Sequence, residues 1–458
     1  SPMVEQPRKA IVIGGGPTGI VISGLLAKKG WKVDLFEKES RQACTETAEQ
    51  HLSRAYAIST SARTLEVLDE LDARQDVLDE GGYYRYNTFV HAGHKIVAPL
   101  KQVSFTTLSV VKTQLVCGLL KAVERQFSHL VHISFENGCV SAGLAQDTEP
   151  AFVTVERSGP QKLTADLIVF ADGWNSCGRA CFLRDDPLFQ SKVEPSITLF
   201  KTIVFKPLPA WPARSSHFWM GWNGLTIIGR ENIIDNTLLC LMAFKKNTPA
   251  TASDLTGTDL RSLLAKTFTK VQLPLDDVVT QEELNRVAAA PSYDNPNSLT
   301  CSHYNHRNVV LLGDAAQSVP INVAHGTNAA LQSALQLAAM LDSDDDVDLC
   351  LARYSNSRKP EMDALQRMMK HPFLTAGRRS RRGTWKHRLL ERLRRWTGLP
   401  YLAHVQTQLG LNELSYVEVE RNMLWQQATP VVVAGSVGVV SAGLWVLWVR
   451  ALLKLRDK

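Results

Sequence analysis

A glycine-rich motif near the start of the chain has the spacing that binds a pyrophosphate. It is Gly14-x-Gly16-x-x-Gly19, with an apolar run before it and Glu37 at the end of the next apolar run. In this pattern the first glycine permits a tight turn, the second lets backbone N–H groups approach a phosphate, and the third lets a helix pack on a strand. Glu37 is placed to accept a hydrogen bond from a ribose hydroxyl. The motif predicts a dinucleotide site, and a purely structural glycine turn is the alternative.

Two later motifs put a carboxylate beside a glycine at the end of an apolar run. DGWNSCGR (172–179) follows the apolar residues 167–170, and GDAA (313–316) follows the apolar residues 309–312. Asp-Gly and Gly-Asp pairs are common at turns, so each motif alone also fits an ordinary strand exit. Three such motifs in this order are hard to explain by turns alone, and the set therefore favours a functional site.

The segments that must hold these motifs alternate between strands and helices. The first motif lies between an expected strand at Lys9–Ile13 and an expected helix at Ile20–Lys29, and a second strand at Trp31–Glu37 completes the opening of a βαβ unit. Between residues 196 and 246 the pattern changes to β-rich runs broken by Pro, Asn and Gly, which predicts an inserted antiparallel sheet. Further helices are expected at Thr60–Leu71, Lys112–Phe127, Asn328–Leu341 and over residues 350–425, and further strands at Val131–Phe135, Phe152–Glu156, Leu167–Phe170 and Val309–Leu312.

Composition excludes several classes of protein. The chain has 458 residues, 45% of them apolar and 21% charged, which is typical of a globular protein and not of a disordered or fibrous one. The net charge is +6, but residues 378–395 alone hold nine Lys or Arg and one Glu, so the rest of the chain is near neutral. This excludes a general nucleic-acid binder. The basic cluster either rests on anionic lipid or is a solvated helix face. Eight cysteines without a CxxC pair predict reduced thiols and no zinc site.

The end of the chain has the composition of a membrane span. Residues 431–449 contain no charge, Pro430 precedes them and four basic residues follow. About 20 apolar residues cross the hydrocarbon core of a bilayer, and Trp445 and Trp448 lie near one end, as interfacial aromatics do. With no visible signal peptide, the pattern predicts a tail anchor in the lipid bilayer, with the rest of the protein facing the cytosol. A buried core helix is the alternative.

Together the GxGxxG, DGxxSxxR and GD motifs resemble those of the single-component FAD-dependent aromatic hydroxylases of the p-hydroxybenzoate hydroxylase type, over residues 9–341. The resemblance implies an α/β fold in which a Rossmann-type FAD-binding domain carries an inserted antiparallel β-sheet substrate domain, followed by a C-terminal helical region and one transmembrane helix. The expected boundaries are 8–80, 105–190 and 300–345 for the FAD-binding domain, 81–104 and 191–299 for the substrate domain, 346–429 for a basic helical region and 430–453 for the anchor.

The resemblance also implies which residues bind FAD. Asp172 and Gly173 would serve both FAD and the nicotinamide donor, Asp314 would bind the ribityl chain, and the helix that begins near Asn328 would face the flavin O2 edge. Lys112 stands where relatives have Arg, which keeps the charge but loses the bidentate fork. The full expected set is Gly14, Gly16, Pro17, Thr18, Gly19, Glu37, Lys38, Arg54, Lys112, Asp172, Gly173, Arg179, Gly313, Asp314, Pro320, Gly326, Thr327 and Asn328.

The tail makes the chain similar in architecture to the kynurenine 3-monooxygenases. The segment LSYVE (414–418) is similar to their membrane-proximal helix, in which a Tyr reaches the substrate, so Tyr416 is a candidate catalytic contact. Packing at a helix interface is the alternative for this Tyr. Gln317 stands where those enzymes have a His after GDAA, and several other substrate-contact positions also differ. The resemblance therefore leaves the substrate open.

Other side chains are candidates for contact with the substrate. His325 lies in the expected flavin-proximal loop, where it would orient the substrate or tune a proton, and Arg85 is placed to pair with a substrate carboxylate. Trp219 and Trp222 on the expected sheet would wall an aromatic pocket. The alternatives are a packed or surface His, a surface ion pair and ordinary core packing of the two Trp side chains.

The resemblance implies an activity as well as a fold. It implies an NAD(P)H-dependent flavoprotein monooxygenase that hydroxylates an aromatic or indolic small molecule with O2, through a flavin C4a-hydroperoxide. NADPH and NADH both stay open as the donor. The expected membrane is the mitochondrial outer membrane or the endoplasmic reticulum. Two alternatives are an FAD-dependent epoxidase of a terpenoid or alkaloid intermediate, and a tail-anchored flavin-fold protein without turnover.

Overall fold

The computed structural model describes residues 7–370 and 405–425, apart from short gaps. The chain divides into two compact units, residues 1–369 and 370–458. The gaps lie at residues 47–56, 84–85, 92–93, 100–107, 147–148, 157–158, 196–197, 221–224, 233–235, 247–254, 270–272, 293–297, 321–324 and 342–345.

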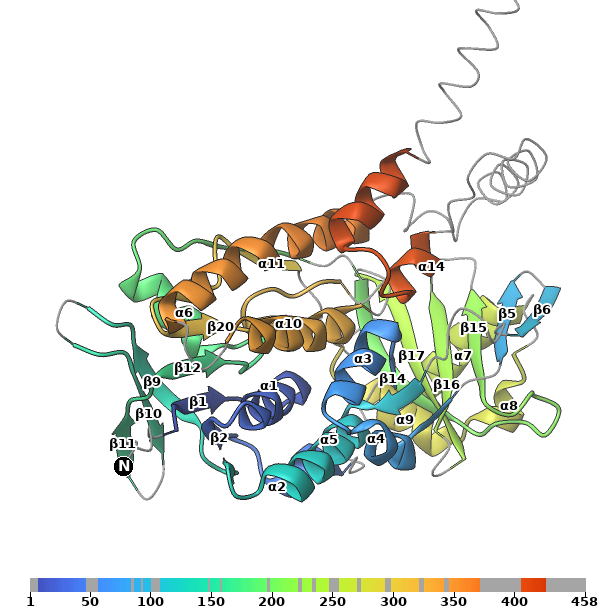
Figure 1. Ribbon diagram of the computed structural model, residues 1–458. Coiled ribbons are helices and arrows are strands. Elements are labelled where there is room, and N and C mark those ends of the chain that lie inside the picture. Colours follow the sequence, from blue (N-terminus) through green and yellow to red (C-terminus); the bar gives the residue numbers. More distant parts are fainter. Residues whose placement is uncertain are drawn as a thin grey trace, which may run out of the picture. The chain divides into compact units, whose positions relative to one another are not determined.

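A mixed six-stranded sheet lies at the centre of the first unit (Figure 1). Its strand order is β19-β20-β12-β1-β2-β8, and all neighbours are parallel except β19, which runs antiparallel to β20. The central strands are buried along almost their whole length, which explains why their sequences are continuous apolar runs rather than alternating ones. The strands are β1 (Lys9–Ile13), β2 (Lys32–Phe36), β8 (Val131–Ser134), β12 (Leu167–Phe170), β19 (Asn305–His306) and β20 (Val309–Leu311).

Helices cover this parallel sheet and form one hydrophobic core with it. Helix α1 (Pro17–Lys28) packs against both α5 (Lys112–Phe127) and α10 (Gly326–Met340), and the long helix α11 (Val347–Lys370) runs above α10 (Figure 1). The remaining helices of this part are α2 (Arg41–Thr45), α3 (Ala62–Glu70), α4 (Arg74–Glu80) and α6 (Cys177–Asp185). A three-stranded sheet of β9 (Cys139–Gly143), β10 (Phe152–Glu156) and β11 (Pro160–Leu163) lies against α6, and a second one pairs β3 (Ala57–Ser59), β7 (Leu108–Val111) and β4 (Gly82–Tyr83).

A second six-stranded sheet has the order β14-β17-β16-β15-β5-β6. It is antiparallel except between β15 and β5, which run parallel. These two strands are far apart in the sequence, so the connection between them is long enough for parallel pairing. One of its faces packs on three helices and forms a separate hydrophobic core. Its strands are β5 (Tyr86–His91), β6 (His94–Pro99), β14 (Thr198–Phe205), β15 (Ser215–Met220), β16 (Thr226–Asn232) and β17 (Thr237–Lys245); the helices are α7 (Gly257–Phe268), α8 (Leu275–Val278) and α9 (Gln281–Ala289). The pair β13 (Ser191–Glu194) and β18 (Ser298–Cys301) connects the two sheets along the chain.

The described part of the second unit is short. It contains α14 (Val405–Gly410) and a helix over residues 416–425, whose first turn is capped by Ser415 through hydrogen bonds with Glu418. Within the described residues no helix is long and apolar enough to cross a membrane. The expected anchor at 430–453 and the basic cluster at 378–395 lie outside the described residues.

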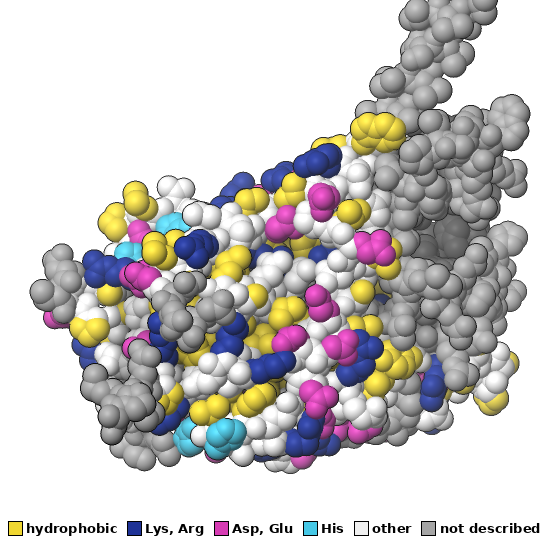
Figure 2. Space-filling model, viewed as in Figure 1, with side chains coloured by type: hydrophobic (Ala, Val, Ile, Leu, Met, Phe, Trp, Pro, Cys, Tyr) yellow, Lys and Arg dark blue, Asp and Glu magenta, His cyan; other side chains and the backbone are white. Residues whose placement is uncertain are grey.

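Basic and acidic side chains alternate over the face shown in Figure 2. Helices α4 and α5 are joined by ion pairs, such as Lys121 with Glu80 at 2.5 Å and Arg125 with Asp76 at 2.8 Å. Exposed pairs of this kind each contribute about 0–1 kcal/mol. The face therefore shows the near-neutral charge balance expected for the chain outside its basic cluster.

Candidate cofactor site

Four neighbouring parallel strands end at one edge of the central sheet, and each ends in one of the motif residues. In sheet order, β20 leads to Gly313, β12 to Asp172, β1 to Gly14 and β2 to Glu37. Strand β1 has later strands on both sides, so the chain connections diverge there and leave a crevice at the carboxyl ends. The three motifs that lie far apart in the sequence therefore meet at the place where open α/β sheets bind ligands.

The glycines of the first motif have separate tasks. Gly14 has φ +104, and a Cβ there would lie 2.5 Å from the carbonyl oxygen of Ala171, so this position requires Gly. A Cβ at Gly19 would collide with the carbonyl oxygen of Gly14, whereas a Cβ at Gly16 would have no atom within 4 Å. Gly16 is the N-cap of α1, with Pro17 at the first helical position. The free backbone N–H groups at this helix start therefore border an open cradle, which is the arrangement that binds a pyrophosphate.

Glu37 is buried beside that cradle and is held by backbone donors. Its Oε2 accepts a hydrogen bond from the N–H of Gly15 at 2.6 Å, and its Oε1 accepts one from Glu39 at 2.9 Å. An ionised carboxylate has about four acceptor positions, so two remain for ribose hydroxyls. The side chain of Lys38 is exposed and packs beside Gly138.

Asp172 and Arg179 hold the second motif together. The Oδ2 atom of Asp172 accepts a hydrogen bond from the N–H of Cys177 at 2.6 Å, while its Oδ1 is buried with no hydrogen-bond partner among the described residues. Burial raises the pKa of this carboxyl, and donors from Ser176 and the helix start oppose that effect. Arg179 donates to the carbonyl of Trp174 and, at 3.0 Å, to that of Ala315. A buried acceptor without a donor fits a site completed by a bound group.

Asp314 lies in the short 3₁₀ turn at Gly313–Ala315 and its side chain reaches solvent. The surrounding protein nevertheless raises the pKa of this carboxyl, against the opposing charges of Lys112 and Arg179. The carboxyl is therefore solvent-accessible but has many protein atoms around it. Lys112 is the first residue of α5, and Thr18 packs against Gly313. The structure thus brings together residues from all three motifs and from the start of α5 at one edge of the central sheet.

At the start of α10, the side chain of Asn328 makes structural hydrogen bonds within the protein. Asn328 was expected to contact the cofactor, but its amide is committed to the segment before α3: Oδ1 accepts from the N–H of Ser61 at 2.6 Å and from Thr64 at 2.7 Å, and Nδ2 donates to Ser59 at 2.9 Å. The side chain therefore ties α10 to α3, and the backbone N–H groups of the first turn of α10 suit a ligand because they have no acceptor within the helix. A contact of Asn328 with the cofactor stays a prediction. Pro320, Gly326 and Thr327 precede and open the same helix.

The chain matches the protein family described as FAD binding domain over residues 8–368. It belongs to this family. It is 26% identical over 385 residues to violacein synthase of Chromobacterium violaceum, covering 79% of this chain and 84% of that protein. It is 23% identical over 514 aligned positions to a kynurenine 3-monooxygenase of Cryptococcus neoformans, covering 96% of this chain and 97% of that one. The structure of 2-methyl-3-hydroxypyridine-5-carboxylic acid oxygenase has the same fold, with a TM-score of 0.65 and 20% identity, over 81% of this chain and 92% of the other.

The protein is therefore an FAD-dependent monooxygenase, and the crevice described above fits FAD. The open cradle at Gly16 fits its pyrophosphate, Glu37 its ribose, and the free acceptors of Asp172 and Asp314 its hydroxyl groups. When bound, FAD supplies hydride acceptance and oxygen activation. The chain's own residues must bind it, hold the substrate beside it and exclude water.

His325 is buried at the N-cap of α10. Burial and the charge of Arg63 lower the pKa of this imidazole to about 4, so it is neutral at pH 7. Its Nδ1 is buried with no hydrogen-bond partner in the part of the chain that the structure describes. A neutral ring can accept or donate a hydrogen bond, which fits a role in orienting a ligand better than one in donating a proton.

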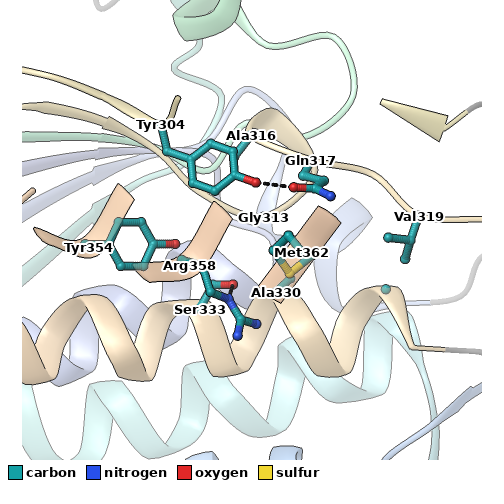
Figure 3. A pocket seen from close by; sticks show the side chains of 11 residues that line it. Tyr304, Gly313, Ala316, Gln317, Val319, Ala330, Ser333, Tyr354, Arg358 and Met362 are labelled. Carbon is teal, nitrogen blue, oxygen red and sulfur yellow. Dashed lines mark hydrogen bonds between the residues drawn. The ribbon is translucent and has the colours of Figure 1, made fainter. Parts of the chain in front are cut away.

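Gln317 points away from solvent into a small cavity between the Gly313 turn, α10 and α11 (Figure 3). Its side-chain oxygen accepts a hydrogen bond from the hydroxyl of Tyr304. On the opposite wall Arg358 donates to Ser333 at 2.8 Å. These side chains pack against the turn that carries Asp314, and Gln317 helps to hold that turn in place. Gln317 is the position at which the sequence comparison expects His in the kynurenine 3-monooxygenases.

The roles expected for several other residues stay predictions, and one expectation is wrong. Arg54, Arg85 and Trp222 lie outside the described residues. Tyr416 is buried in the second unit, and its role toward the substrate stays a prediction. Trp219 was expected to line a pocket, but this is wrong: it is 3% exposed and packs in the core between the second sheet and its helices. It lies on the helix-facing side of β15, because side chains alternate between the two faces of a strand.

The opposite face of the second sheet holds side chains that the sequence did not single out. Phe218, Ile228 and Leu241 pair in register across β15, β16 and β17 and are half-exposed. On the same face Leu239 packs against Val111, the residue before Lys112. We refer to Phe218, Ile228 and Leu241 as the apolar row. The alternation of β-rich runs could have revealed it, but the register that aligns the three strands is not visible in the sequence.

Proposed function

We propose that this monooxygenase hydroxylates an aromatic or indolic small molecule, taking electrons from NADPH or NADH and one oxygen atom from O2. The observation that carries the proposal is the apolar row, which lies on the face of the second sheet opposite to the one that packs on α7, α8 and α9; among the described residues no helix packs over this row. A row of one aromatic and two branched side chains suits a flat ring, because burial of apolar area favours binding of such a molecule.

The position of the row supports this proposal. Leu239 is two residues from Leu241, on the same face of β17, and contacts Val111 at the start of α5. Gln114 of the same helix donates a hydrogen bond to Asn232 at the end of β16, at 3.0 Å. The face of the second sheet that carries the apolar row is therefore turned toward the start of α5. The first residue of α5 is Lys112, whose charge lowers the pKa of Asp314. A molecule held against this face would lie near the cofactor crevice, as oxygen transfer requires.

The relatives support a ring-containing substrate without fixing its identity. Their names include violacein synthase and kynurenine 3-monooxygenase, at 26% and 23% identity. We propose kynurenine, or an indolic compound of similar size, as the first substrates to test. The apolar row also suits an isoprenoid, so an FAD-dependent epoxidase is the second candidate.

The test is NADPH and NADH oxidation by the purified, FAD-loaded full chain in detergent. Kynurenine, a set of indoles and a set of terpenoids would each be added, and the products examined by mass spectrometry. The proposal expects faster oxidation with a ring compound and a product heavier by one oxygen atom. Oxidation and epoxide formation with terpenoids alone would replace it by the epoxidase. Bound FAD with no turnover on any compound would favour a non-catalytic protein.

We also propose that residues 430–453 anchor the protein in a membrane, the mitochondrial outer membrane or the endoplasmic reticulum, with the flavin unit facing the cytosol. The proposal is supported by the uncharged residues 431–449 and the basic residues after them. A fusion of a fluorescent protein to residues 426–458 tests it. The fusion is expected to stay in the membrane pellet after alkaline carbonate extraction, and release into the supernatant would contradict the anchor.

A further inference from the structure

Two cysteines meet beside the cofactor crevice. The Sγ atoms of Cys139 and Cys177 are 3.3 Å apart, although the residues come from β9 and from the start of α6. Both side chains are half-buried and therefore within reach of small molecules from solvent. A disulfide has an S–S distance of about 2.05 Å. Small rotations of the two side chains can bring the sulfur atoms to that distance.

The two thiols differ in reactivity. Cys177 is the first residue of α6, and its pKa is lowered by the hydrogen bond that Cys139 donates and by the charge of Arg184, against burial and the charge of Asp172. The start of a helix also favours a thiolate. The pKa of Cys139 is raised, first by the same hydrogen bond and then by burial. Cys177 is therefore the nucleophile of the pair, and Cys139 is the thiol that can resolve its oxidised form.

Both thiols belong to segments that hold carboxylates of the cofactor site. The backbone N–H of Cys177 donates to Oδ2 of Asp172 at 2.6 Å. Two residues before Cys139, the N–H of Asn137 donates to the carbonyl of Glu37 at 2.8 Å. A covalent bond between the sulfur atoms would thus connect the backbone that positions Asp172 to the backbone that positions Glu37.

We propose that Cys139 and Cys177 are a redox modification site, at which hydrogen peroxide forms a reversible disulfide that weakens FAD binding. The Cys177 thiolate attacks one peroxide oxygen, the O–O bond breaks, and the second oxygen leaves as hydroxide and takes up a proton to become water. The Cys139 thiol then attacks the sulfur of the resulting sulfenic acid, the S–O bond breaks, and the oxygen atom that had bonded to Cys177 leaves as water with the Cys139 proton. In sum, two thiols and one peroxide give one disulfide and two waters.

The weakening follows from the geometry. Drawing Cys177 toward β9 moves its N–H relative to Asp172, and the carboxylate loses the donor that fixes its orientation. The loss of one hydrogen bond to a charged group corresponds to about a tenfold change in affinity or more. Reduction by a dithiol restores the original contact, which makes the effect reversible.

The test treats the full-length, FAD-loaded protein with hydrogen peroxide and then with dithiothreitol. Three quantities are measured: free thiols, the masses of peptides that contain residues 139 and 177, and the FAD dissociation constant of the protein after removal of the flavin. We expect two thiols to disappear together, a cross-linked peptide to form, and FAD affinity to fall about tenfold and recover on reduction. None of these readouts depends on the substrate or on turnover, so the test is independent of the proposed function.

Single variants separate the steps. Cys139→Ser is expected to bind FAD normally, to give a sulfenic acid at Cys177 that a dimedone probe traps, and to show no cross-link. Cys117→Ser is the matched control, because Cys117 is also half-buried but burial and Glu80 raise the pKa of its thiol. It is expected to behave as the wild type. A Cys139–Cys177 pair that stays reduced while other thiols oxidise, or a cross-link that leaves FAD affinity unchanged, would overturn the proposal.

Discussion

The cofactor edge of the central sheet and the apolar row of the second sheet hold their side chains in different ways. At the cofactor edge each residue lies at or just after the end of its own strand and is fixed by nearby backbone, as Glu37 is by Gly15 and Asp172 by Cys177. The apolar row is brought together by strand register: Phe218 is opposite Ile228, and Ile228 is opposite Leu241, across three strands. The first region therefore requires particular residues at fixed spacing, whereas the second can change its shape by single substitutions.

The two regions also differ in how many residue types they tolerate. Cofactor binding depends on positive φ at Gly14 and on contacts that a side chain would block, so few residues are allowed there. The row has half-exposed side chains on one face of strands whose other face forms the core. If the row is the substrate wall that we propose, a substitution on this face changes that wall without opening a cavity in the core.

The sharpest test of the comparison uses neighbouring residues of β16. Ile227 faces the helices and is fully buried, whereas Ile228 belongs to the row. Ile227→Ala is expected to lower the free energy of unfolding by about 2–5 kcal/mol and to leave KM of the retained activity almost unchanged. Ile228→Ala is expected to leave thermal stability near that of the wild type and to raise KM about tenfold, through lost apolar contact with the substrate. Equal effects of the two variants on KM would contradict the assignment of substrate contact to the apolar row.

A smaller effect is expected on the cofactor side as the pH falls. The pKa of His325 is about 4 in the folded protein, and 6.5 is its ordinary value. Between these values the unfolded chain binds a proton that the folded chain does not, so stability is complete above pH 6.5 and is lost as the pH falls toward 4, by roughly 3 kcal/mol. Urea unfolding at several pH values measures this.

The variant His325→Gln is expected to lose that part of the pH dependence, because Gln does not titrate in this range. His129→Gln is the control, since His129 is exposed and lies far along the chain from α10. A wild-type pH profile in the His325 variant would show that another group causes the acid sensitivity.

Much of the fold around the cofactor was predictable because its signals are local. The helix Lys112–Phe127 and the strands Phe152–Glu156 and Leu167–Phe170 have the predicted bounds, and α10 begins two residues earlier than expected, at Gly326 rather than Asn328. Glycine spacing and short apolar runs are properties of neighbouring residues, so they are visible in one sequence.

The features that were missed depend on long-range pairing. Trp219 was expected to wall a pocket but packs in the core, and the parallel pairing of β15 with β5 was not foreseen. The hydrogen bonds of Asn328 join residues more than 260 positions apart in the chain. Strand register and such contacts follow from the packing of whole elements, and the sequence around Trp219 or Asn328 does not specify them.

The most direct test of the account is the FAD affinity of Gly16→Ala. A Cβ at this position meets no protein atom within 4 Å, and its φ of −72 suits any residue, so the variant should fold with the melting temperature of the wild type. If the cradle holds the pyrophosphate of FAD, the added methyl group occupies its space and the dissociation constant rises at least about tenfold. Unchanged FAD affinity in a normally folded Gly16→Ala protein would contradict the assignment of this crevice to FAD.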